Sequence, residues 1–535
     1  MTTTRLPGIS LLCAGLVLFS SGCSKKEPAT TAKILLFGNG AEPQDIDPHV
    51  VTGVTENKII NALFEGLVTE PASGVGVAPG VAETWNLSPD GLVYTFHLRA
   101  DAKWSDGRPV TATDFVRSYQ RMLTPSLAAE YAYQLYPLVN AEAYNKGTLT
   151  DFAQVGAKAL DDRTLQLTLN NRTPYLLEEM KHYAWFPVPV DTIAKLGGLA
   201  RKGSAWTRPE NFVGNGPFIL KEWKPNQRLV ATRSPTYWDR ATVKLDEIDF
   251  LPIESGETEE RMFRSGQLDR TESLPLSKIA VYKRDFPSMY REDPYYGVYF
   301  YRLNVTKPPL NDVRVRRALA IAIDREAIVR DILRGGQTPA WNYTPPSPGF
   351  AATARISSDL AEARRLLAEA GYPGGKNFPH VELLYNTLEA HRTLAEAIQQ
   401  MWKIRLGVDI TLQNQEWKVY LDSQNTGNYQ IARAGWIGDY PDPSTFVSMW
   451  MTGAGNNQTG WSNANYDRLL RASTSASTEA ERMADYQQLE QILADEVPVI
   501  PIYFYTRVYA LNPRVKGWVP QLMDNRAWKW IDLAE

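Results

Sequence analysis

The sequence predicts an α/β protein with mixed sheets, and three features support this fold class. Segments of strand type and helix type alternate along the chain, so neither kind is collected in a block of its own. At 535 residues the chain is long enough for more than one domain. Its composition, 44% hydrophobic and 22% charged, is that of an ordinary globular protein. We therefore expect several α/β lobes with hydrophobic cores.

We interpret residues 1–22 as a lipoprotein export signal. Arg5 supplies a positive charge, residues 9–19 form an apolar stretch too short to span a bilayer, and small residues lead up to Cys23. Ser20 stands where the best-known lipobox has Leu. We expect cleavage before Cys23, lipidation of its sulfur and a polar tether over residues 23–32. The alternative is an ordinary secretory signal, and either way the protein is exported to the periplasm or the cell surface.

The two cysteines, the charge and the apolar segments exclude several classes of protein. Cys13 lies in the removed segment, so the mature chain has one thiol and neither a disulfide framework nor a cysteine metal site. The net charge of −3, without a basic run, argues against nucleic acid as a partner. No later segment is apolar enough to span a membrane. We expect contact with the membrane through the lipid anchor alone.

The first predicted strand covers residues 34–37, a short apolar run. Residues 94–98 follow a strong turn at residues 88–91 and alternate apolar with polar side chains, which is the period of a half-buried strand. Residues 165–169 alternate in the same way, and residues 228–232 and 408–412 are also of strand type.

Three helices are predicted with the same clarity. Residues 360–370 have an apolar face, a possible cap at Ser358 or Asp359, and Gly371 and Pro373 after the end. Residues 315–333 and 389–406 repeat the helical spacing of apolar side chains. These helices lie between strands, as an α/β fold requires.

A search for catalytic and metal-binding motifs finds none. The five histidines have no paired spacing, and the nucleophile elbow, the phosphate loop and the Gly-rich dinucleotide turn do not occur. We therefore expect no enzyme activity, no metal and no cofactor.

Aromatic residues are more informative, since there are 15 Trp and 26 Tyr, with clusters at residues 131–133, 183–186 and 295–301. Most should be core residues, and the others suit a large, semi-polar ligand cleft. The sequence therefore indicates a capture protein.

Several motifs then point to a family. Residues 104–115 (WSDGRPVTATDF) closely resemble the best-known motif of the extracellular solute-binding proteins of peptide/nickel ABC importers (family 5). Residues 47–48, 63–67, 215–218, 235–238, 303–304, 308–309 and 312–316 resemble further blocks of that family. Residues 433–440 (RAGWIGDY) resemble its periplasmic oligopeptide-binding branch in particular.

This resemblance implies a three-lobed periplasmic-binding-protein fold of type II character, with mixed sheets and two hinge crossings. Lobe I would combine residues 33–64, 189–290 and 506–535, lobe II would cover residues 65–188, and lobe III residues 291–505. It also implies the function. A monomer would capture short peptides with a free α-amino group between two closing lobes, with weak sequence preference, and deliver them to the transmembrane permease subunits.

By the resemblance, Asp439 pairs with the α-ammonium of the peptide. Enclosing an ammonium in a closing cleft costs several kcal/mol unless a carboxylate meets it. The alternative is that Asp439 is simply a turn residue in the stretch 438–443.

The same resemblance implies the rest of the site. Gly53, Val54 and Gly435 would pair with the main chain of the peptide as an added strand does. Arg433 and His391 would act as cations at its carboxylate end, although Arg433 could instead form a structural ion pair and His391 could be a surface residue at a helix start. The remaining ligand-contacting residues would be Trp436, Tyr131 and Asn456. Gln424 departs from the pattern, because the best-known peptide receptor has a further Arg there.

Two alternatives stay open. Within the same fold the ligand could be a murein peptide, a nickel chelate or another solute, although nickel has no support from cysteine or paired histidine. In another class, the chain could be an exported carbohydrate-active enzyme, which would need a specific pair of carboxyl groups across a cleft.

Overall fold

The computed structural model of the chain describes residues 32–534. The predicted signal, the lipidation at Cys23 and the tether up to residue 31 lie outside these residues. From Lys33 onward the chain forms one compact unit. None of the helices between residues 32 and 534 has the length and apolar character needed to cross a lipid bilayer.

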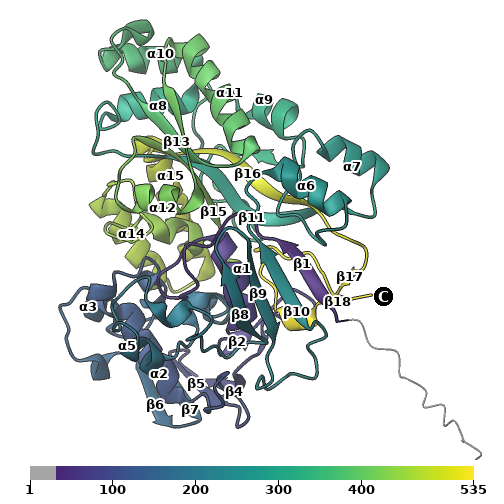
Figure 1. Cartoon of the computed structure of the whole chain (residues 1–535). Helices are drawn as coiled ribbons and strands as arrows, with labels where there is room; N and C mark the ends of the chain where they lie inside the picture. The colour runs from purple at the N-terminus through teal and green to yellow at the C-terminus, as the bar shows by residue number, and fades with distance from the viewer. Residues whose placement is uncertain (1–31, 535) are drawn as a thin grey trace, which may run out of the picture. The chain divides into compact units, whose positions relative to one another are not determined.

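The first sheet joins the start of this unit to a segment some two hundred residues later (Figure 1). Its strands, in spatial order, are β1 (Ile34–Gly38), β10 (Glu247–Leu251), β9 (Arg228–Arg233) and β8 (Phe218–Lys224). β1 is parallel to β10, whereas β10, β9 and β8 pair antiparallel. The strands predicted at residues 34–37 and 228–232 are confirmed. Helix α1 (Val54–Leu63) packs near β8 and begins directly after Gly53.

The second sheet is antiparallel, with the order β4 (Ala82–Leu87), β5 (Val93–Leu98), β7 (Thr164–Thr168) and β6 (Ala157–Asp161). On β5 the alternate residues Tyr94, Phe96 and Leu98 are buried, as their period predicts. Helix α2 (Ala112–Leu123) packs on this sheet and starts at a capping box between Thr111 and Asp114. The motif at residues 104–115 thus includes the start of a helix.

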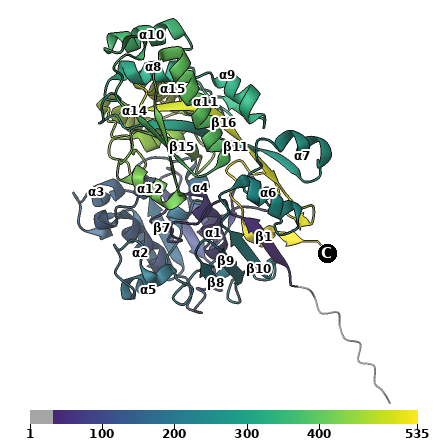
Figure 2. The same cartoon turned by 45° about the horizontal axis from the view of Figure 1, so that its top comes forward.

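The third sheet is the largest and is mixed. Its order is β12 (Thr338–Pro339), β16 (Val499–Ala510), β11 (Tyr290–Leu303), β15 (Ile431–Ile437), β13 (Glu382–Asn386) and β14 (Thr411–Gln415). Figure 2 shows the helices around this sheet, among them α8 (Val313–Ile321), α10 (Leu360–Glu369), α11 (Glu389–Leu406), α14 (Ala464–Thr474) and α15 (Glu479–Glu496). The mixed α/β architecture predicted from the sequence is confirmed.

The long strands β11 and β16 extend beyond the third sheet toward the first (Figure 1). Residues 290–294 of β11 pair with residues 506–510 of β16, and residues 298–302 pair with residues 499–504. Between these two ladders the register shifts, so that residues 295–297 lie opposite Tyr505 alone. The predicted lobe boundaries near residues 290 and 505 fall within these two strands. The three-lobe division itself stays a prediction.

Two predicted elements differ from the structure. The single helix predicted over residues 315–333 is wrong, because α8 ends at Ile321 and is followed by α9 (Arg325–Ala327) and a π-helical turn (Ile328–Leu333). The guanidinium of Arg325 is buried and donates hydrogen bonds to the carbonyl oxygens of Ala320 and Ile323, at 3.0 and 3.3 Å. The predicted strand at residues 408–412 begins later, at Thr411. The helix over residues 389–406 is confirmed.

Candidate functional site

The site begins at an open edge of strand β15. On one side β15 pairs with β11 from residue 431 to residue 437, whereas on the other side it pairs with β13 only at Ile431 and Ala432. The carbonyl oxygen of Arg433 faces this second side, where it accepts hydrogen bonds from Tyr420 and Gln424. Because backbone groups alternate along a strand, the N–H and C=O of Gly435 face the same side. An extended ligand can therefore add to β15 here.

Asp439 lies just beyond the end of this edge and is buried, with 8% of its surface exposed. Its carboxylate accepts hydrogen bonds from Gln134 at 2.9 Å, from the Tyr131 hydroxyl at 3.3 Å and from Thr445 at 3.4 Å. The fourth neighbour is His182, with 3.4 Å between Nε2 and the carboxylate. Within residues 32–534, no Lys or Arg forms an ion pair with Asp439.

Each of these four neighbours of Asp439 is neutral. Burial lowers the pKa of His182 to about 3, and its Nδ1 accepts a hydrogen bond from the backbone of Ala184, so the proton is on the Nε2 that faces Asp439. Desolvation raises the pKa of the Asp439 carboxyl to about 8, although its hydrogen bonds lower it in part. The carboxyl group is thus held in place by neutral donors and lacks a cation.

Arg433 provides the opposite charge near the start of the open edge. Its guanidinium donates to Asn386 at 3.2 Å and to the Tyr505 hydroxyl at 3.0 Å, and it lies 4.8 Å from the ring centroid of Tyr299. In the part of the chain that the structure describes, its Nε has no hydrogen-bond partner and the guanidinium has no carboxylate partner. A structural ion pair, the alternative considered for Arg433, is not present among these residues.

His391 is near this cation but does not share its charge. The residue lies in the first turn of α11 and is buried, not at the surface. Burial, with a contribution from the charge of Arg433, lowers its pKa well below 6.5. Its Nδ1 has no hydrogen-bond partner among residues 32–534. His391 can therefore offer a hydrogen bond to a ligand, and the positive charge at this end comes from Arg433.

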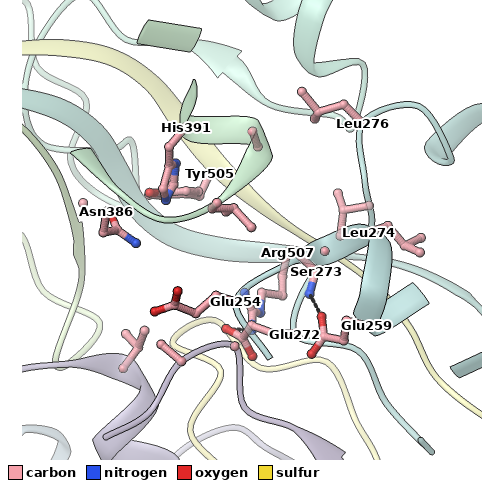
Figure 3. Close-up of a pocket in the computed structure, with 18 of the residues that line it drawn as sticks. Glu254, Glu259, Glu272, Ser273, Leu274, Leu276, Asn386, His391, Tyr505 and Arg507 are labelled. Carbon is pink, nitrogen blue, oxygen red and sulfur yellow. Dashed lines mark hydrogen bonds and ion pairs between the residues drawn. The ribbon is translucent and has the colours of Figure 1, made fainter. Parts of the chain in front are cut away.

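One cavity of about 260 Å³ connects several of these groups. Among its lining residues are Val54, His391, Arg433 and Gly435, which the sequence had predicted as ligand-binding residues. Figure 3 shows His391, Asn386 and Tyr505 on one wall and Glu254, Glu259 and Glu272 on another. On the second wall, the charge of Glu272 is compensated by ion pairs with Lys58, Arg270 and Arg507.

The N-terminal segment contributes the opposite side of the site. Gly53 is extended and precedes α1, and a Cβ atom built on it would lie 1.9 Å from the Glu56 carboxylate and 3.0 Å from the Trp417 ring. Trp417 belongs to α12 (Trp417–Asn425) and donates a hydrogen bond from Nε1 to Glu56 at 3.2 Å. This bond links α1 to a helix beside the third sheet, so glycine at position 53 permits close contact of the two segments.

The remaining predicted residues lie around Asp439 and are not among the residues that line the 260 Å³ cavity. Tyr131 contacts Asp439 directly, as described above. Asn456 is buried and donates to the Tyr133 hydroxyl at 3.4 Å. Trp436 lies on the other face of β15 from Gly435 and donates from Nε1 to the carbonyl of Thr445 at 2.9 Å. It therefore supports the Asp439 turn from the core side.

Sequence reasoning missed several groups of the site. Gln134, His182 and Thr445 contact Asp439, and Asn386 and Tyr505 contact Arg433. The aromatic clusters at residues 131–133 and 183–186 flank two of these residues and were the available signal. There was no signal in the sequence for Asn386 and Tyr505, because their positions beside Arg433 depend on pairing between strands that are distant in the chain.

No group of three or more His, Cys, Asp or Glu between residues 32 and 534 is placed to hold a metal ion. Among the same residues, Asp439, a buried carboxyl group without a cation, and Arg433, a guanidinium without an anion, are instead suited to a ligand with charges of both signs.

Comparisons with known proteins agree with this geometry. Residues 76–458 match the family model described as bacterial extracellular solute-binding proteins, family 5 middle. The periplasmic oligopeptide-binding protein OppA of Escherichia coli (strain K12) is 38% identical over 522 residues, which cover 95% of this chain and 94% of that protein.

Solved structures of relatives are similar over nearly the whole chain. The murein tripeptide binding protein MppA of Escherichia coli has a TM-score of 0.90 at 36% identity, covering 94% of this chain and 99% of its own. Haemophilus influenzae OppA in complex with RPPGFSPFR has a TM-score of 0.88 at 35% identity, with coverage of 94% and 99%. The unliganded open form of MppA gives only 0.62. The described residues therefore match the first MppA structure better than the open form.

Proposed function

Because this chain belongs to family 5 of the bacterial extracellular solute-binding proteins, we propose that it is the substrate-binding component of an ABC importer for short peptides. It captures a peptide between closing lobes and delivers it to the transmembrane subunits of a permease. Binding closes the cleft because both sides contact the ligand, which gives the closed form the higher affinity.

The observation that carries this proposal is the open edge of β15 that ends at Asp439. The N–H and C=O of Gly435 pair with the peptide main chain, and Gly53 and Val54 contact it from the opposite side. Asp439 then accepts the peptide α-ammonium, the cation that this buried carboxyl group lacks.

The other end of the peptide meets Arg433. A peptide carboxylate supplies the anion that the guanidinium lacks, and His391 adds a hydrogen bond. From Arg433 to Ile437 the open edge is about 13 Å long, the length of about four extended residues. Main-chain bonds and terminal charges are common to all peptides, so sequence preference is weak.

The cellular setting follows the same proposal. The chain is exported, is anchored to a membrane through a lipid on Cys23, and works as a monomer in the periplasm or at the cell surface. It is a receptor and not an enzyme, a proposal supported by the role of its relatives OppA and MppA as binding proteins.

Calorimetry with a free tripeptide and its N-acetylated form tests the proposal. Acetylation removes the positive charge of the α-ammonium that is proposed to pair with Asp439, and we expect it to weaken binding about 100-fold or more. The C-terminal amide of the same tripeptide keeps the α-ammonium and removes only the charge at the Arg433 end, so it measures the contribution of the other terminus separately. Equal affinity for the free and acetylated forms would defeat the assignment of Asp439.

A murein peptide is a second candidate, favoured by the TM-score of 0.90 with the murein tripeptide binding protein. Competition between tri-alanine and purified murein tripeptide separates the two. If the murein ligand binds at least tenfold more tightly, it replaces the general peptide as the proposed cargo.

A further inference from the structure

A second cavity, of about 820 Å³, lies on the outer side of the Asp439 region, and we call it the outer groove. The residue ranges 87–94, 133–142 and 170–179 form one wall, and residues 440–451 and 470–482 contribute the other. It shares no lining residue with the cavity at Arg433. Exposed residues such as Ser477 and Glu479 line it, so it opens to solvent.

Glu179 is the unusual group in the outer groove. It ends the short helix α4 (Leu176–Glu179) and has only 3% of its surface exposed. Within residues 32–534, no group donates a hydrogen bond to its carboxylate and no cation pairs with it. Desolvation, with the nearby charges of Asp439 and Asp442, raises its pKa well above 4.5.

Two other buried glutamates of this chain, Glu65 and Glu490, have the hydrogen-bond donors that Glu179 lacks in the described part of the chain. Glu65 accepts hydrogen bonds from Tyr237 and Trp238, both at 2.6 Å. Glu490 accepts two backbone N–H bonds, each of 2.9 Å, from residues 343 and 344. Because an unpaired buried carboxyl group is costly, such a group in a solvent-open groove indicates a missing ligand.

The walls of the groove suit an organic cation. Tyr175 and Tyr440 line it and are stacked on each other with ring centroids 5.1 Å apart, and Tyr133 and Tyr136 add two further aromatic rings. The guanidinium of Arg482 already lies 5.3 Å from the Tyr175 ring centroid, as a cation bound to an aromatic face does.

Among the other charged residues of the groove, the exposed Arg172 donates to the backbone carbonyl of Asp90 at 2.7 Å, and the rest form ion pairs. Arg482 binds Asp442 at 2.8 Å and Glu479 at 2.7 Å. Glu142 pairs with Lys146 and lies 3.6 Å from Arg471. Among the buried charged side chains that line the groove, Glu179 is therefore the one without a partner within residues 32–534.

We propose that the outer groove binds an organic cation, an ammonium or a guanidinium, with its charge on Glu179 and its carbon atoms against the tyrosines. Two sources share this chemistry. One is a free amine. The other, which rests on the proposed peptide function, is a lysine or arginine side chain at the first residue of a peptide held by Asp439.

Titration with n-butylammonium chloride tests the proposal, with 1-butanol as the neutral isostere. The test variant is Glu179→Gln, and Glu142→Gln is the matched control, because Glu142 lines the same groove but is already ion-paired. We expect saturable binding of butylammonium that weakens at least tenfold in Glu179→Gln and changes less than twofold in the control. Butanol should not bind. Absence of saturable binding, equal binding of butanol, or unchanged affinity in Glu179→Gln would overturn the proposal.

Peptides then identify the source of the cation. If Glu179→Gln abolishes a preference for Lys-Ala-Ala over norleucine-Ala-Ala, the cation is the first side chain of the peptide. If the variant affects butylammonium alone, the cation is a free amine. Tri-alanine has no side-chain charge, so its binding tests the proposed peptide function alone. A protein that does not bind tri-alanine would contradict the peptide function without bearing on cation binding in the outer groove.

Discussion

Burial of Asp439 without a ligand opposes closure of the cleft, and asparagine at this position should remove most of that opposition. In this structure, which we infer to be the closed form from its poorer match to the unliganded open form of MppA, desolvation raises the pKa of Asp439 from 3.8 to about 8. A raised carboxyl pKa means that the closed form binds more protons, so closure becomes less favourable as the pH rises from 3.8 to 8. At pH 7.5, Asp439 alone makes closure of the ligand-free protein less favourable by about 5 kcal/mol, because each pKa unit is worth about 1.4 kcal/mol.

Small-angle scattering of the empty protein at pH 7.5 measures this effect. We expect Asp439→Asn to have a smaller radius of gyration than the wild type without ligand, and yet to bind tri-alanine more weakly. Asp442→Asn is the control, because Asp442 is compensated by Arg482 at 2.8 Å and imposes no such cost on closure. An empty Asp439→Asn protein as open as the wild type would refute the reasoning.

Three further predictions concern other parts of the molecule. Burial lowers the pKa of His49 to about 3, so the contribution of the neutral imidazole to the free energy of unfolding is complete above pH 6.5 and is lost as the pH falls toward 3. In urea unfolding, His49→Gln should therefore reduce the difference in stability between pH 7 and pH 5 by about 2 kcal/mol. An unchanged difference would contradict this prediction. Trp417→Phe removes the hydrogen bond to Glu56 and should weaken peptide binding about fivefold by calorimetry, whereas the control Trp223→Phe should not. Arg433→Met should abolish the preference for a free C-terminal carboxylate over an amide, and a preference that survives would exclude Arg433 as its partner.

Local signals in the sequence were sufficient for much of the fold. The strand at residues 93–98 follows from its alternation, and α11 begins and ends where its apolar spacing does. The helix break after Ile321 was not predictable, because its cause is the buried guanidinium of Arg325. This group donates hydrogen bonds to the backbone carbonyl oxygens of Ala320 and Ile323, which a continuous helix would use for its own hydrogen bonds. Its partners include Ala340 and Pro501, which are distant in sequence.

The sequence indicated the charged residues of the candidate site but not the residues around them. Asp439 and Arg433 stand in a recognisable block, and the structure leaves both without an oppositely charged partner among residues 32–534. His391 was expected to be a cation, but the burial that makes it neutral depends on packing between α11 and the third sheet. Glu179 gave no signal, because its lack of partners is a property of the assembled groove.

The register shift between β11 and β16 bears on how this protein moves. Evenly paired strands would have to give up hydrogen bonds in order to bend, whereas here the ladder is already interrupted at residues 295–297. We expect the two paired segments on either side of this point to rotate as rigid bodies, through changes in the backbone torsion angles of residues 295–297. We therefore expect little backbone strain to oppose a rotation at this point, so that in the proposed function the contacts with the peptide, and not release of backbone strain, favour closure.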